Sequence, residues 1–115
     1  MATITVVLAD PPYGKQRPYT ALRFLLTALK EGHQANLFLL EDAVFAAKKE
    51  QQPPDMPDCE EMLQAAIQEG LKVRACTVCS VERGLKLEEV TEGVDRGTMV
   101  DLVNWVVESD RTVFF

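Results

Sequence analysis

Hydrophobic and polar residues follow two different spacings along the chain, and these alternate from one segment to the next. Short runs of β-branched and apolar residues are typical of strands. These runs are residues 3–8, 36–40, 71–76 and 111–115. Between them, apolar residues recur at the spacing of a helix that packs one face on a core. These helical segments are residues 18–31, 41–49, 59–69 and 98–107.

Strands that alternate with helices are typical of an α/β fold with a mostly parallel sheet and helices on its faces. At 115 residues the chain can form one modest core, so we expect a single domain over residues 1–115. Functional groups in such sheets gather in loops beyond the carboxyl ends of the strands. Two loops are therefore of interest, residues 9–17 and the segment from Cys76 onward. Residues 86–97 are expected to form a further loop, with at most one turn of helix.

The net charge of the chain limits the classes of partner that it can be expected to bind. Acidic residues outnumber basic ones by 18 to 12, the net charge is −6, and no basic cluster appears, so no direct nucleic-acid partner is expected. No apolar run approaches the length of a membrane span. The apolar start "MATITVVLAD" lacks a preceding Lys or Arg and is too short for a signal peptide. We therefore expect a cytoplasmic protein.

Two of the three cysteines stand three residues apart in "RACTVCSVERGL", where Cys76 and Cys79 follow a predicted strand. Such a pair can serve as metal ligands, as a dithiol redox couple, or as one reactive thiol beside a bystander. A structural zinc site needs about four Cys or His ligands. The chain offers this pair and the lone His33, so no metal site is expected.

The loop "ADPPYGK" lies between a strand and a helix, as a phosphate-binding loop does. That motif needs a glycine where Ala9 stands and a hydroxyl where Gln16 stands, and two prolines here lack the N–H groups that would cradle a phosphate. We interpret the loop as a rigid turn, which joins a site only if it reaches Cys76. Its candidate site residues are Asp10, Tyr13, Gly14 and Lys15.

A single reactive thiol is favoured over a thioredoxin-like dithiol. The helix after Cys79 spans only about two turns before Gly84, and no proline follows Pro57 to face a dithiol. Cys76 ends a strand and opens a helix, where unpaired backbone N–H groups stabilise a thiolate. Cys59 has no motif around it and is expected in the core.

The role of Cys79 has two interpretations. It either packs inward as a small apolar residue, which we favour, or it attacks a persulfide on Cys76 as a second thiol. For packing, the segment offers four apolar anchors: Val78, Cys79, Val81 and Leu85.

Two stretches resemble the DsrE/TusD sulfur-relay family. The first is "VVLADPPYGKQRPYTALRFLLTALKEGHQANLFLLEDAVFAA", with a Pro-x-Tyr-Gly turn, a long helix ending in Gly-His, and a strand followed by a short helix. The second is "VRACTVCSVERGL", a strand that ends in cysteine with Arg83 and Gly84 seven and eight residues on. The tail "SDRTVFF" resembles the closing strand of that family, so the likeness covers nearly the whole chain.

The resemblance implies a three-layer α/β/α sandwich in which Cys76 carries sulfane sulfur as a persulfide. It further implies a cofactor-independent sulfurtransferase or carrier that meets sulfur donor and acceptor proteins. Assembly into homo-oligomers (trimer or hexamer), or hetero-oligomers with related subunits, is implied too. The chain itself supports an oligomer, because it is too short to cover the apolar side chains near its end. These are Trp105, Val106 and Phe114. The alternatives left open are a Cys76–Cys79 redox or regulatory dithiol and a non-catalytic subunit that binds a partner or ligand.

Overall fold

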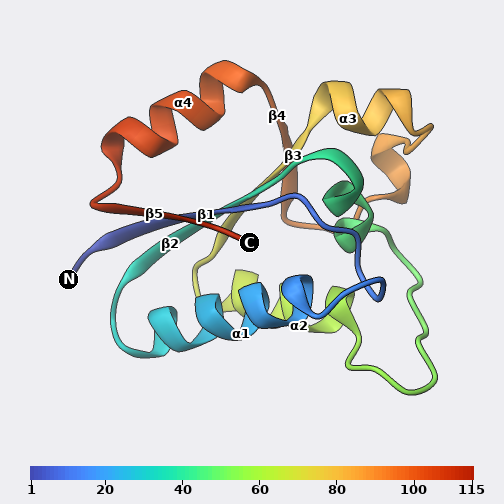
Figure 1. Cartoon of the computed structure of the whole chain (residues 1–115), viewed down its shortest axis with the longest axis horizontal. Coiled ribbons are helices and arrows are strands. Elements are labelled where there is room, and N and C mark those ends of the chain that lie inside the picture. The colour runs from blue at the N-terminus through green and yellow to red at the C-terminus, as the bar shows by residue number, and fades with distance from the viewer.

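A five-stranded sheet with helices on both faces forms the centre of the protein (Figure 1); the computed structural model describes residues 1–115. The strands are β1 (Thr3–Leu8), β2 (Gln34–Leu39), β3 (Lys72–Cys76), β4 (Val94–Gly97) and β5 (Arg111–Phe114). The α-helices are α1 (Arg17–Lys30), α2 (Cys59–Gln68), α3 (Thr77–Glu82) and α4 (Met99–Glu108). Two 3₁₀ helices complete the chain, η1 (Glu41–Ala47) and η2 (Leu87–Glu89).

The strands run in the order β4-β3-β2-β1-β5, and every pairing is parallel. Helices α1 and α2 cover one face of the sheet, and α3 and α4 cover the other (Figure 1). The predicted α/β sandwich is therefore confirmed, and its sheet is wholly rather than mostly parallel. The loops after β1, β2 and β3 leave the sheet at its carboxyl edge, as such a sheet requires.

The central strands are buried from both sides. Val6, Val7 and Leu8 of β1 are almost fully buried, as are Leu37 and Phe38 of β2. Strands covered on both faces carry continuous apolar runs rather than alternating ones, and such runs predict these strands from the sequence. Cys59, at the start of α2, belongs to the same core, as expected from the sequence.

Strand β4 was not predicted, because residues 94–97 were expected to lie in a loop. It is an edge strand of four residues that pairs only with β3. Two of the four, Asp95 and Gly97, are poor strand formers, so local preference gives little signal. Pairing with β3 overrides that preference and places Gly97 directly beside Cys76.

Helix α4, which covers the second face of the sheet, is held by hydrogen bonds at its first turn and at its end. Thr98 and Asp101 form reciprocal capping hydrogen bonds at its first turn. At its end, the Ser109 hydroxyl lies 2.5 Å from the hydroxyl of Thr5, to which the Asn36 amide also donates. None of the helices is both long and apolar enough to cross a membrane.

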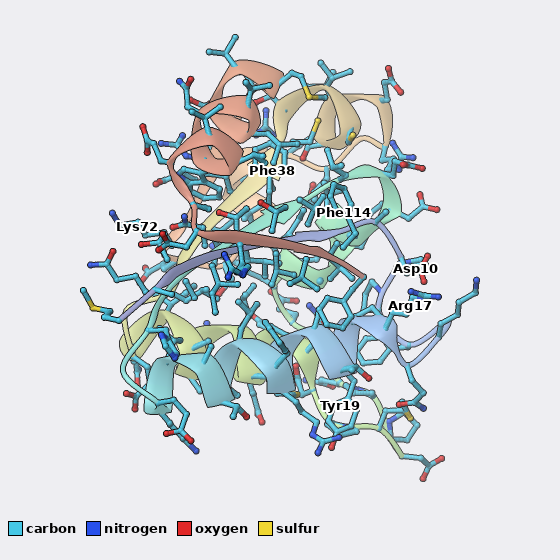
Figure 2. All side chains as sticks on the ribbon, turned by 60° about the vertical axis from the view of Figure 1, so that its left-hand side comes forward. Asp10, Arg17, Tyr19, Phe38, Lys72 and Phe114 are labelled. Atoms are coloured by element: carbon cyan, nitrogen blue, oxygen red, sulfur yellow. The ribbon has the colours of Figure 1, made fainter.

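The outer face of α4 stays apolar and exposed. Trp105 is half-buried, with its ring in an edge-to-face contact with Phe38 at 6.1 Å between centroids. Phe114, on the edge strand β5, is 71% exposed and lies on the side of that strand where α3 and α4 are found (Figure 2). The exposed apolar residues of α4 are Met99, Val100, Val103, Val106 and Val107.

Candidate functional site

Cys76 stands where β3 ends and α3 begins. It is the residue that caps the start of α3, and its Sγ accepts a hydrogen bond from the Cys79 backbone N–H at 3.4 Å. Its side chain is only 8% exposed. The turn is held by Ser80, whose buried hydroxyl donates to the Cys76 carbonyl at 2.8 Å. The backbone therefore offers the sulfur an N–H donor, the arrangement expected from the sequence.

Gly97 lets the neighbouring strand approach this joint. A methyl group in place of its hydrogen would lie 2.8 Å from Cε2 of Phe38, closer than real side chains approach, and 3.0 Å from Cβ of Arg74, which is tighter than most real contacts. The carbonyl of Gly97 also accepts a hydrogen bond from the Thr77 hydroxyl at 3.1 Å, which ties the first residue of α3 to β4. The lack of a side chain at Gly97 thus helps to place Cys76.

Cys79 is half-buried, and its backbone N–H is the donor to the Cys76 sulfur. Burial raises the pKa of the Cys79 thiol, and the hydrogen bond to the Cys76 thiol raises it further, whereas the Glu41 backbone N–H and the Arg83 charge lower it.

The expected anchors of α3 are only partly correct. Val78 and Val81 were expected to pack inward, but they are 64% and 63% exposed. Leu85 is buried as expected, and Ser80, which was not among the expected anchors, is buried too. Ser80 can be buried because its hydroxyl finds a partner within the helix turn, which satisfies its polar group without water. Val78 and Val81 therefore point outward from this short helix.

Arg83 and Asp42 connect α3 to the turn after β2. The Arg83 Nε lies 2.7 Å from the Asp42 carboxylate, and its Nη1 donates to the Cys79 carbonyl at 3.2 Å. The sequence resemblance singled out Arg83, but not this partnership. Asp42 carries no local signal, because an acidic residue in the first turn of a helix is ordinary.

The side chains of the loop after β1 form their hydrogen bonds and ion pairs away from Cys76 and Cys79. Asp10 pairs with Arg17 at 3.5 Å, and the two lie together at the start of α1 (Figure 2). The Tyr13 hydroxyl donates to the Gln51 side chain and accepts from the Cys59 backbone N–H at 3.1 Å. Gly14 and Lys15 are exposed and have no side-chain hydrogen bond or ion pair. No hydrogen bond or ion pair joins these four residues to Cys76 or Cys79.

The third cysteine has its own polar neighbour. Burial raises the pKa of the Cys59 thiol, while a hydrogen bond from Tyr13 lowers it. Burial likewise raises the pKa of Tyr13 to about 12. Cys59 is almost fully buried, and no group of three or more His, Cys, Asp or Glu side chains is arranged to hold a metal ion.

Comparisons with known proteins agree with this architecture. The sequence matches the DsrE/DsrF-like family over residues 2–115. An uncharacterized protein of Methanopyrus kandleri is 54% identical over 97% of this chain and 93% of its own length. YchN of Escherichia coli is 31% identical, with both chains fully covered.

Solved structures show the same fold. The crystal structure of YchN from Escherichia coli superposes with a TM-score of 0.93 over the whole of both chains, at 29% identity. A protein of unknown function from Methanobacterium thermoautotrophicum superposes with a TM-score of 0.84 over the whole of both chains. That second likeness, at 10% identity, concerns the fold alone.

Proposed function

The chain belongs to the DsrE/DsrF-like family, and from this membership and the geometry of its thiols we propose that it is a sulfur-relay protein that carries a persulfide on Cys76. The observation that carries the proposal is the Cys76 sulfur at the joint of β3 and α3, which accepts the Cys79 backbone N–H at 3.4 Å. Backbone N–H donors at the start of a helix favour the thiolate form of a cysteine in general, and the thiolate is its nucleophilic form.

The proposed cycle is two sulfur transfers with no net oxidation. The Cys76 thiolate attacks the outer sulfur of a donor persulfide, forms a sulfur–sulfur bond, and releases the donor as a thiolate. An acceptor thiolate then attacks the outer sulfur on Cys76, takes it as its own persulfide, and frees the Cys76 thiolate. Each step parallels thiol–disulfide exchange, and no cofactor takes part.

Cys79 supports the carrier role as a proton-bearing neighbour. Its raised pKa keeps it a thiol at neutral pH, because deprotonation would cost the buried position and the hydrogen bond to Cys76. A thiol is a poor nucleophile, so attack on the Cys76 persulfide is disfavoured. The sulfur on Cys76 would then survive until an acceptor arrives.

A redox or regulatory dithiol is the second candidate, and the observation that favours it is the contact between the two cysteines, in which the Cys79 N–H lies 3.4 Å from the Cys76 sulfur. In that reaction the Cys79 thiolate attacks the inner sulfur of the Cys76 persulfide, forms a Cys76–Cys79 disulfide, and releases hydrosulfide. A Cys79→Ala variant separates the two functions. Equal persulfide lifetimes in the variant and the parent support the carrier, and a much longer lifetime in the variant supports the dithiol.

The assignment of Cys76 is tested by loading with a low-molecular-weight persulfide donor and measuring the intact mass. We expect Cys76→Ser to abolish the gain of sulfur and Cys59→Ser, the matched buried control, to retain it. Equal loading of wild type and Cys76→Ser would contradict the assignment. A loss of two protons in place of a gain of sulfur indicates the dithiol, and an unchanged mass indicates a non-catalytic subunit.

We further propose an oligomer, a trimer, hexamer or assembly with related subunits. The exposed apolar face of α4 and the exposed Phe114 support it, because monomers rarely expose a contiguous apolar face of this kind.

The proposed location is the cytoplasm, where reducing conditions keep three free cysteines as thiols. Sulfur donor and acceptor proteins are the proposed partners.

A further inference from the structure

Arg83 makes two contacts that point in different directions. Its Nη1 reaches back along α3 to the Cys79 carbonyl at 3.2 Å, and its Nε reaches across to Asp42 of η1 at 2.7 Å. A guanidinium can do this because its donors are fixed in one plane, whereas an ammonium group offers a single point of charge. Arg83 therefore fixes the distance between Cys79 and the turn that begins η1.

The turn that Arg83 reaches is strained. Glu41, which precedes Asp42, has a φ of 50°, a left-handed conformation that side-chain-bearing residues rarely adopt. Its backbone N–H lies near the Cys79 sulfur and lowers the pKa of that thiol. Strained backbone persists only where surrounding contacts hold it, and it gathers at functional sites. The Arg83–Asp42 pair is such a contact, one residue away from the strain.

We propose that Arg83 and Asp42 are positioning residues that clamp the strained Glu41 turn against α3 and so keep the Glu41 N–H directed at the Cys79 sulfur. The fixed N–H then sets how readily the Cys79 thiol, the neighbour of the Cys76 sulfur, gives up its proton. The consequence for sulfur transfer rests on the proposed function, but the clamp itself does not.

The charges around Cys79 allow a clamp to be distinguished from a simple effect of the Asp42 charge on this thiol. The groups that face this thiol are Cys76 and Arg83 from its own segment, and Arg83 in turn faces Asp42 of η1 and Glu82. Asp42 is an anion. If it acted on the thiol by charge alone, its removal would make Cys79 easier to deprotonate. If it acts as a clamp, its removal releases the Glu41 N–H and makes Cys79 harder to deprotonate. The two explanations predict opposite signs.

The experiment is the pH profile of Cys79 alkylation by iodoacetamide, read from the Cys79 peptide by mass spectrometry in the full-length protein. We expect Asp42→Asn to raise the midpoint by roughly 0.3 to 0.7 pH unit, the size of effect that a partly exposed ion pair supplies. Arg83→Lys, which keeps the charge but cannot make both contacts, is expected to raise it as well. The matched control is Arg17→Lys, which alters the Asp10 pair far from the thiols and is expected to leave the midpoint unchanged.

A midpoint that falls or stays constant in Asp42→Asn overturns the clamp, and so does an Arg83→Lys profile identical to wild type. Because alkylation needs no sulfur donor, this result is independent of persulfide loading. If wild type fails to load sulfur while the midpoints shift as stated, the clamp stands and the proposed function falls. If loading succeeds and the midpoints do not shift, the reverse holds.

Discussion

Gly97→Ala tests most sharply how the structure places Cys76. The new methyl group would lie 2.8 Å from Cε2 of Phe38 and 3.0 Å from Cβ of Arg74. The ring of Phe38 is fully buried and packs against Trp105, so it cannot swing aside without disturbing α4. The strain must therefore be spread over β4, the ring and the helix above it.

The size of the effect follows from two opposing contributions. Overpacking a full core costs about 1–3 kcal/mol, while replacing glycine by alanine stabilises by about 0.4–1 kcal/mol through the unfolded state. We therefore expect Gly97→Ala to lower the free energy of unfolding by about 1–2 kcal/mol. In a domain of this size each kcal/mol lowers the melting temperature by about 4 °C.

Urea unfolding at one fixed protein concentration measures this loss, with the fluorescence of Trp105, the single tryptophan, as the probe. The control is Gly14→Ala, whose new methyl group would meet only Pro11 at an ordinary 3.5 Å, so its stability should stay within about 0.5 kcal/mol of wild type. Phe38→Leu should relieve the clash, so the double variant should lose less than the sum of the two single losses. Strict additivity, or an unchanged Gly97→Ala stability, would refute the packing argument.

Three further outcomes follow from the structure. Ser109→Ala should cost about 1–2 kcal/mol in urea unfolding, because it removes a partner of the buried Thr5 hydroxyl; no loss would contradict that network. Tyr13 has a folded-state pKa of about 12 against an ordinary 10, so its contribution to stability is complete below pH 10 and is lost as the pH rises towards 12. Urea midpoints between those pH values should therefore fall more steeply in wild type than in Tyr13→Phe, and parallel curves would argue against it. Light scattering should report a multiple of 12.8 kDa, and Val103→Asp, on the outer face of α4, should shift the protein towards the monomer; a wild-type monomer would refute the proposed oligomer.

Most of the sheet could be predicted from the sequence, because its central strands are buried on both faces and their apolar runs are continuous. β4 could not, since Asp95, Arg96 and Gly97 form a strand only because β3 offers a partner. The inward packing of Val78 and Val81 was wrong for a related reason. A two-turn helix has too few residues for a periodic pattern to tell its inner face from its outer one.

The candidate site, like the fold, could be predicted from the sequence only in part. The thiol at the strand–helix joint could be found from sequence order alone, because the N–H donor to Cys76 is a property of the local backbone. The contact between Arg83 and Asp42 joins residues 41 positions apart, and no local pattern reveals it. The loop with Tyr13 was a candidate by its position after β1, and the structure directs its hydroxyl to α2 and Gln51.

The central claim is that Cys76 carries sulfur that a partner thiol can remove. The most direct measurement is to incubate wild-type protein with a persulfide donor, locate the added sulfur by peptide mass spectrometry, and then add an acceptor thiol. We predict one added sulfur on Cys76, none on Cys59, and its loss from Cys76 to the acceptor with the thiol restored. Sulfur found on another cysteine, or a Cys76–Cys79 disulfide with release of hydrosulfide before the acceptor is added, would contradict it.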